Sequence, residues 1–332
     1  MSVIVKGGGG GKSSGQYVWK KYELIPSYLS FIGNEDFTLK TYNTTKNWDG
    51  TLEYSTNKST WNTWDGTEIS SAGNKLYLRG TGNTRIAGSS SDYRFVFTGT
   101  DALKIACEGN IENLLDYETV SAGGHPTMAD YCYRYMFYGC TALTTVPELP
   151  ATTLANSCYS NMFYGCTALT TAPELPATTL ANSCYQYMFN GCTSLTTAPE
   201  LPATMLAEGC YRNMFKGCTA LATAPALPAT TLVMRCYQNM FNGCTSLTTA
   251  PALPATTLAR GCYEYMFYGC TKIKLSTTKT GEYQTAYRIP TSGTGTTATD
   301  ALADMFINTG GTFTGTPEIN TTYYLSTSNT VV

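Results

Sequence analysis

The sequence predicts an α/β solenoid, built from 26-residue units of one helix and one short strand, that follows an N-terminal all-β, sandwich-like domain. A motif beginning with cysteine recurs six times at intervals of 26 residues. Each unit joins a stretch of helical composition to a short extended stretch that ends at proline. The preceding part of the chain has short β-type runs separated by turn residues. We expect a flexible glycine-rich arm over 1–16, a small β-sandwich over 17–92, the solenoid with a degenerate N-terminal cap over 93–275, and a hairpin insertion with a C-terminal cap repeat over 276–332.

The first 16 residues have too little apolar surface to offset the entropy of ordering them. Their GGGGGKSS run resembles a phosphate-binding loop, but Lys6 stands where that motif requires its first glycine, so we expect no nucleotide site. The apolar run Val3 to Val5 is far shorter than the core of a secretory signal, which has about 7 to 15 residues. No apolar stretch has the roughly 18 to 20 residues that span a bilayer, so we expect no membrane insertion.

The β-type runs of the next region end at Gly or Asn and Asp turn pairs, as strands of a small sandwich do. The runs are Tyr28 to Ile32, Phe37 to Tyr42, Thr51 to Tyr54 and Lys75 to Arg79. All four tryptophans, Trp19, Trp48, Trp61 and Trp64, lie here. We expect them in the core, with sugar binding as the alternative.

The repeat is followed most clearly through one cysteine per unit: Cys132, Cys158, Cys184, Cys210, Cys236 and Cys262. A degenerate unit precedes the array at Phe97 to Leu103, and another follows it at Met305 and Phe306. Terminal units that must face water are expected to be atypical, so we interpret both as caps. The Thr/Gly-rich segment from Ile273 to Thr297 is predicted to be a hairpin.

Within one unit, Thr178 or Thr179 is expected to cap a helix that begins at Leu180 and runs through Phe189. Gly191 stands where such a helix needs a left-handed residue. The stretch Leu195 to Leu201 is predicted to be extended and is kept short by its prolines. Because adjacent helices need about 8 to 10 Å and adjacent strands about 4.8 Å, the array should bend with its strands inside.

Comparison of the six copies separates fixed positions from variable ones. The fixed positions, Leu180, Ala181, Cys184, Tyr185, Met188 and Phe189 in one unit, fall on one side of a helical projection, and the variable ones fall on the other. The variable face is rich in Tyr, Asn, Ser and Arg, a composition typical of recognition surfaces. The candidate ligand-binding residues are Ser160, Asn161, Tyr164, Gln186, Tyr187, Asn190, Arg212, Asn213, Lys216, Gln238, Asn239, Asn242, Glu264 and Tyr265. The alternative interpretation is that these positions vary only because exposed residues tolerate substitution, without any role in binding.

The strand side offers an alternative binding face, since Thr144, Thr170, Thr196 and Thr248 would form a uniform ladder suited to a repetitive glycan. Glu148, Glu174 and Glu200 would stack beside it, but Ala226 and Ala252 interrupt the acidic row. We therefore interpret these acids as a solvated edge rather than a calcium site.

Twelve of the 13 cysteines occupy two fixed positions of the repeat. Their spacing of eight within a unit is no zinc motif and has no histidine beside it, so we expect free, buried thiols. In the predicted helices, cysteines of successive coils would lie too far apart for a disulfide. The strand-side row, from Cys140 to Cys270, is less strictly excluded from bridging.

His125, the only histidine, is expected in a loop, without a nucleophile motif near it. Charged residues form only 13% of the chain and the net charge is −2, so no basic patch predicts nucleic-acid binding. We expect no enzyme activity, no catalytic residue, no metal and no cofactor.

The segment GCTSLTTAPELP, Gly191 to Pro202, and its neighbours resemble BspA-type leucine-rich repeats, with their FxGCxxL core and proline-ended strand. The likeness covers about half of the chain. The 26-residue unit is longer than is usual in that family, and Cys and Met stand where aliphatic residues are more common.

That resemblance implies surface recognition or adhesion. The glycine-rich leader, the β-domain and the absence of an export signal also resemble tail-fibre or receptor-binding proteins of gut bacteriophages. The first expectation is therefore a phage tail protein, in a virion, that contacts a bacterial surface protein or glycan. Its N-terminus would face tail or baseplate proteins. The sequence leaves open whether the chain forms a homo-oligomer. The alternative is a BspA-like adhesin or protein-interaction module on the bacterial cell surface.

Overall fold

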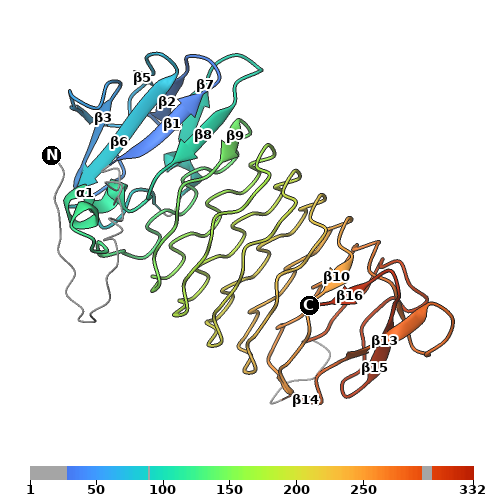
Figure 1. The fold of residues 1–332 in the computed structure, drawn as a ribbon. Coiled ribbons are helices and arrows are strands. Elements are labelled where there is room, and N and C mark those ends of the chain that lie inside the picture. The colour runs from blue at the N-terminus through green and yellow to red at the C-terminus, as the bar shows by residue number, and fades with distance from the viewer. Residues whose placement is uncertain (1–27, 89, 294–300) are drawn as a thin grey trace, which may run out of the picture.

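The computed structural model describes residues 28–88, 90–293 and 301–332. The expected arm over 1–16, with its phosphate-loop-like run, and Trp19 lie outside the described residues. A row of similar coils runs between an N-terminal pair of sheets and a C-terminal group of short strands (Figure 1). The fold is a repeat solenoid, as the sequence predicts, but its coils differ from the predicted ones.

The N-terminal region holds two sheets. The larger has the strand order β4-β3-β6-β1-β8-β9, and the smaller has the order β5-β2-β7. The strands are β1 (Leu29–Gly33), β2 (Thr38–Thr41), β3 (Thr51–Ser55), β4 (Asn62–Trp64), β5 (Ile69–Ser70), β6 (Lys75–Thr81), β7 (Phe95–Thr98), β8 (Ile105–Glu108) and β9 (Leu143–Thr145). All pairs are antiparallel except β8 with β9. The four strands expected from β-type runs are thus confirmed to within a few residues.

Aromatic side chains join the two sheets. Phe31 of β1 lies 5.2 Å from Phe97 and 6.4 Å from Phe95, both on β7, measured between ring centroids. Trp64 stacks on Trp48 at 5.2 Å, and both are buried, whereas Trp61 is half-buried against Arg79. Two of the three described tryptophans therefore belong to the core.

One helix covers the end of β6. It is α1 (Asn113–Ser121), interrupted at Asp116, where φ is −156°. A Cβ at Gly80 of β6 would lie 1.7 Å from the carbonyl oxygen of Leu114, so only glycine permits this close packing. A short 3₁₀ turn, η1 (Ser91–Tyr93), precedes β7.

The larger sheet continues into the first coil of the solenoid, because β8 pairs in parallel with β9 of that coil. The N–H of Phe95 donates to the carbonyl of Met136, as the N–H of Phe137 donates to Met162 one coil later. Phe95 therefore occupies the place of the repeated phenylalanine. The sequence comparison put Phe97 in this place, and it was wrong by two residues.

The repeats contain no helix in the described chain, so the predicted helix over Leu180 to Phe189 is wrong. These residues form consecutive turns, each closed by an N–H that bonds to the carbonyl three residues earlier, such as Met188 to Tyr185 at 3.2 Å. The intervening N–H groups point to the next coil instead. Those of Ser183, Tyr185, Tyr187, Phe189 and Gly191 donate to carbonyls 25 residues later, over 2.8 to 3.0 Å. Half of the donors that a helix would use internally thus hold adjacent coils together.

A left-handed residue at every fourth position makes this path feasible. In one coil Ser183, Tyr187 and Gly191 have φ values of 55°, 57° and 73°. The third position of a type II turn requires such values. Gly191 was correctly expected to be left-handed, but it continues a series of turns rather than ending a helix.

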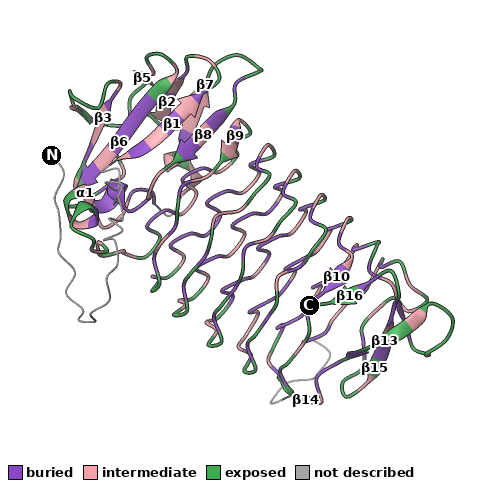
Figure 2. Cartoon of the chain, in the orientation of Figure 1, coloured by how far each residue is buried: buried purple, intermediate pink, exposed green. Residues whose placement is uncertain are grey.

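The fixed side chains form columns through the middle of the solenoid, where Figure 2 shows buried residues on every coil. Cys184, Tyr185, Met188 and Phe189 are at most 1% exposed, and so are their equivalents in the other five coils. The tyrosine rings stack at 5.5 to 5.9 Å between neighbouring coils, and the phenylalanine rings at 5.6 to 5.9 Å. The predicted packed positions are confirmed for these four, while Leu180 and Ala181 are half-buried.

The strand side of the coils has the same close spacing. Its extended residues meet in parallel bridges, such as Thr171 with Thr197 and Thr197 with Thr223. We expected the array to bend because helices need a wider spacing than strands. The described repeats contain no helix, so this argument for a bend no longer applies.

The C-terminal cap completes the array. Its strands are β10 (Thr249–Ala250), β11 (Thr257–Leu258), β12 (Leu275–Ser276), β13 (Tyr283–Arg288), β14 (Ser292–Gly293), β15 (Thr322–Ser326) and β16 (Thr330–Val331). The strand orders are β12-β15-β13, β10-β16 and β11-β14. Because β13 pairs with β15, the described part of the insertion is not the hairpin that the sequence suggested. Phe306 stacks on Phe267 at 5.5 Å and Met305 accepts from the N–H of Phe267, which places the predicted terminal unit over the last full coil.

Candidate functional site

The 14 candidate residues all lie in the turn segments of the coils, 156–165, 182–191, 208–217, 234–243 and 260–269. We call the surface that these segments and the preceding segment 130–139 form the turn ridge. The backbone bonds between coils hold equivalent positions next to one another along it. The candidate residues are therefore brought together, on turns rather than on helices.

The ridge is less exposed than a helix face would be. Ser160, Asn161, Asn190, Asn213 and Gln238 are buried, and the other nine candidate residues are half-buried. Several polar atoms bond to one another. The hydroxyl of Ser160 donates to Asn161 Oδ1 at 2.9 Å, Asn242 Nδ2 donates to Asn239 Oδ1 at 2.9 Å, and Gln238 Nε2 donates to Glu264. Part of the polar character of the ridge thus stabilises the coils themselves.

One left-handed position in the middle of each turn segment differs between coils in a telling way. This position has φ between 54° and 63° in every coil, and its residues are Tyr135, Asn161, Tyr187, Asn213, Asn239 and Tyr265. Asparagine tolerates the left-handed region because its short side chain bonds locally, but a bulky residue there is an outlier. Three coils therefore carry tyrosine at a position whose backbone favours asparagine or glycine.

Tyrosines and an arginine gather at the N-terminal end of the ridge. Tyr138 and Tyr164 stack at 4.8 Å, and Tyr135 meets Tyr138 edge to face at 5.6 Å. The guanidinium of Arg134 lies 4.7 Å from the ring of Tyr135 and 5.3 Å from that of Tyr131. Apart from Tyr164, which was a candidate, this cluster lies in the first full coil, whose residues were not among the candidates, although its variable positions follow the same pattern.

The threonine ladder exists, and the hydroxyls of three of its four members are used within the fold. Those of Thr144, Thr196 and Thr248 donate to carbonyls of the preceding coil over 3.0 to 3.2 Å. One position later in the repeat, Thr171, Thr197 and Thr223 are exposed and lie at parallel bridges between coils. We call the row Thr145, Thr171, Thr197 and Thr223 the threonine face.

All 13 cysteines are free and buried. Those of the second row donate their S–H to the carbonyl of a phenylalanine in the preceding coil, for example Cys192 to Phe163 at 3.1 Å and Cys244 to Phe215 at 3.0 Å. Burial raises the pKa of every thiol, to about 12 for Cys192 and Cys244. The argument from helix spacing against disulfides no longer applies, and the thiols instead act as small hydrogen-bonded core residues.

The glutamates of the strand side and His125 lie apart from the turn ridge. Glu148, Glu174 and Glu200 are exposed. Within the described ranges no three His, Cys, Asp or Glu side chains are placed to hold a metal. His125 lies outside helices and strands, as expected, but its Nδ1 lies 2.7 Å from Oε2 of Glu112, a carboxylate that the sequence did not single out. Burial raises the pKa of Glu112, and the hydrogen bond from His125 opposes this.

No helix in the described parts of the chain combines the length and the hydropathy needed to cross a membrane.

The repeat region matches a known family. Residues 126–248 and 211–285 match the model of the BspA type leucine rich repeat region, in six copies. No curated protein and no solved structure matches the chain significantly. This part of the chain thus carries BspA-type leucine-rich repeats, which agrees with the motif resemblance.

Proposed function

We propose that this array of BspA-type leucine-rich repeats is a non-enzymatic recognition module whose turn ridge binds a protein or glycan on a bacterial surface. The repeat family supports the general part of this proposal, because BspA-type repeats indicate an interaction or adhesion module. The N-terminal region, which we interpret as a sandwich-like domain, then acts as the cap and attachment end.

One observation carries the choice of the ridge. Tyr135, Tyr187 and Tyr265 occupy left-handed backbone positions at which other coils have asparagine. Keeping a bulky residue there costs each coil about 1 to 2 kcal/mol of backbone strain. Such strain tends to persist where a side chain serves function. A half-buried tyrosine supplies rigid contact area that a ligand covers at low entropic cost.

The ridge also has unused hydrogen-bonding capacity. Nε of Arg134, Nε of Arg212 and Oε1 of Gln238 are buried without a hydrogen-bond partner among the described residues. A small movement of these side chains on binding would pair them with a ligand. Tyrosine and arginine are also, with tryptophan, enriched among energetic hot spots.

The proposal has two biological settings, which differ in what lies beside the recognition module. In a phage tail, the N-terminal end would meet tail or baseplate proteins; in a bacterial adhesin, the module would stand on the cell surface. Neighbouring genes distinguish them: tail or baseplate genes favour the first and sortase or secretion genes the second.

The experiment compares binding of labelled full-length protein and its variants to a panel of gut bacteria and purified surface glycans. The combined change Tyr187→Ala, Arg212→Ala and Gln238→Ala removes one ridge side chain from each of three successive coils. We expect it to weaken binding at least tenfold, because hot-spot truncations cost about 2 kcal/mol or more.

The matched control changes the threonine face by Thr171→Ala, Thr197→Ala and Thr223→Ala, which should leave binding within twofold. If the control variant loses binding and the ridge variant retains it, the threonine face is the binding surface. If the wild-type protein binds nothing on the panel, the recognition proposal itself is rejected.

A further inference from the structure

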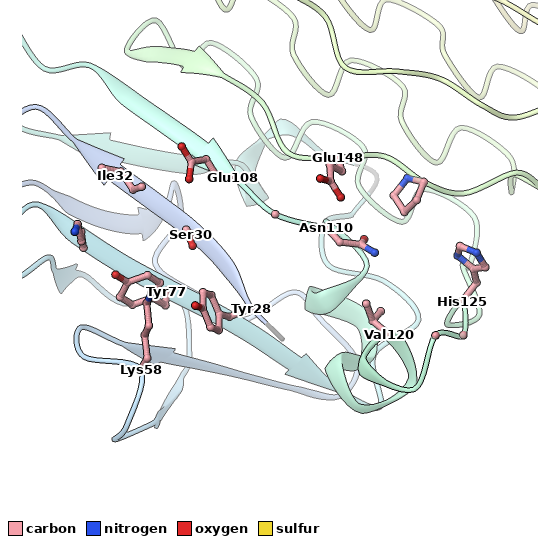
Figure 3. A pocket seen from close by; sticks show the side chains of 15 residues that line it. Tyr28, Ser30, Ile32, Lys58, Tyr77, Glu108, Asn110, Val120, His125 and Glu148 are labelled. Atoms are coloured by element: carbon pink, nitrogen blue, oxygen red, sulfur yellow. The ribbon is translucent and has the colours of Figure 1, made fainter. Parts of the chain in front are cut away.

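A cavity of about 770 Å³ opens where the N-terminal sheet meets the first coil (Figure 3). Its lining comes from β1, β6 and β8, from the loop at 123–125, and from Glu148 and Pro150 of the first coil. This volume is within the range of about 300 to 1,000 Å³ that is typical of small-ligand sites. The cavity includes none of the candidate residues of the turn ridge.

Aromatic rings form one wall. Tyr77 of β6 is only 6% exposed, and Tyr28 meets it edge to face at 5.2 Å. Nζ of Lys58 lies 4.8 Å from the centre of the Tyr77 ring and 5.1 Å from that of Tyr28. Figure 3 shows these three side chains together at one side of the cavity. Packing and the cation hold the rings in place before any ligand arrives.

Hydrogen-bonding groups face the rings across the cavity. Glu108, at the end of β8, and Glu148, on the first coil, are exposed to it, and Ser30 and Asn110 are half-buried beside them. The N–H of Glu148 donates to the carbonyl of Gly109 at 2.9 Å, and the N–H of Ile111 donates to the carbonyl of Glu148 at 3.1 Å. These bonds fix the backbone of Glu148, so the solenoid presents its exposed carboxylate opposite the sheet.

The backbone at this junction leaves little freedom. Gly109 has φ of 97°, and a Cβ there would lie 3.0 Å from the carbonyl oxygen of Tyr28. Its conformation turns the chain from β8 toward Asn110, which forms a parallel bridge with Glu148. On the far side of the cavity, the buried carboxylate of Glu112 orients the exposed ring of His125.

The charges of the lining select the class of ligand. Two lysines, Lys58 and Lys75, balance two exposed glutamates, so neither an anion nor a cation meets a favourable net field. The lining combines donors, acceptors and apolar ring surface, and a sugar ring presents the matching hydroxyl and C–H groups. We propose that this cavity binds one or two units of a neutral saccharide, with Glu108 and Glu148 accepting hydrogen bonds from its hydroxyls.

The test uses the full chain and a panel of D-glucose, D-galactose, D-mannose, N-acetyl-D-glucosamine and their β-linked disaccharides. Saturation-transfer NMR identifies which of them bind, and calorimetry measures the affinity. We expect at least one neutral sugar to bind, and Glu148→Gln and Glu108→Gln each to weaken it at least tenfold, since each removes a charged acceptor.

Glu174→Gln is the matched control, because Glu174 occupies the position of Glu148 in the next coil and lies outside the cavity. It should leave the affinity within twofold. The ridge variant with changes at Tyr187, Arg212 and Gln238 should also leave sugar binding intact, which separates this site from the ridge. The proposal is overturned if no neutral sugar on the panel binds, or if the Glu148 and Glu174 variants bind equally well.

Discussion

Raising the pH from 7 to 9.5 in the presence of reductant is expected to unfold the solenoid cooperatively. All 13 cysteines are buried and have raised pKa values, because the charged thiolate is disfavoured in the core. In the unfolded chain each thiol ionises near its ordinary pKa of about 8.5. A group whose pKa is higher in the folded state contributes stability that is fully present below the unfolded pKa. That stability is lost as the pH rises toward the folded value.

The size of the effect follows from the number of thiols. At pH 9.5 each exposed thiol stabilises the unfolded chain by about 1.4 kcal/mol through ionisation. Over all 13 cysteines this amounts to roughly 18 kcal/mol, more than the 5 to 15 kcal/mol by which most domains are stable. The buried tyrosines, whose pKa values are raised by the same cause, act in the same direction at higher pH.

Urea unfolding followed by circular dichroism at pH 7, 8.5 and 9.5 measures this loss directly. Thiol titration supplies the control: the folded protein at pH 7 should react slowly, and the denatured protein should show all 13 thiols free. An unfolding free energy that stays the same from pH 7 to 9.5 would contradict the burial of the thiol columns. Few free thiols in the denatured protein would show that the cysteines form disulfides.

Replacing one phenylalanine of the central column, by Phe189→Ala, is expected to cost about 3 to 5 kcal/mol of unfolding free energy. Phe189 is 0% exposed and stacks on Phe163 at 5.6 Å and on Phe215 at 5.7 Å. The change removes both ring contacts and leaves a cavity between three coils. Because each coil contacts only its neighbours, it also weakens the coupling between the two halves of the array.

Urea unfolding of the variant should show a lower midpoint, with a second transition if the two halves separate. Thr193→Ala in the same coil is the control, since Thr193 is exposed, and it should change the free energy by less than about 0.5 kcal/mol. A loss below 1 kcal/mol for Phe189→Ala would mean that the phenylalanine column does not hold the coils together.

The 26-residue period and the identity of the core residues were predictable from the sequence, but the local conformation was not. A left-handed residue at every fourth position buries residues in pairs four apart, such as Cys184 and Tyr185 followed by Met188 and Phe189. A helical projection at 3.6 residues per turn puts the same pairs on one face. The two conformations differ in where the backbone N–H groups donate, and bonds to a residue 25 positions away leave no local signal.

The other features that the sequence did not predict also depend on contacts between segments that are distant in the chain. The cavity beside Glu148 depends on the parallel pairing of β8 with β9, which joins residues about 40 positions apart. The partnership of β13 with β15 likewise joins distant segments. On the ridge, comparison of the copies predicted which positions form the variable surface. Their partial burial was not predicted, because it follows from the close spacing of the turns.

We propose that the ridge keeps its tyrosines for recognition, and the most direct test replaces Tyr135, Tyr187 and Tyr265 together by asparagine. Each change relieves about 1 to 2 kcal/mol of backbone strain, because asparagine suits the left-handed backbone better. At Tyr135 and Tyr265 the loss of the edge-to-face contacts with Tyr138 and Tyr268 offsets part of this gain, so we expect a net stabilisation of roughly 0.5 to 1 kcal/mol per change. The reverse change, Asn213→Tyr, should lower stability by a similar amount. Unfolding free energy and binding to the bacterial and glycan panel are measured on the same preparations. A more stable protein with at least tenfold weaker binding is the predicted result, and a more stable protein that binds as tightly as the wild type would contradict a recognition role of these tyrosines.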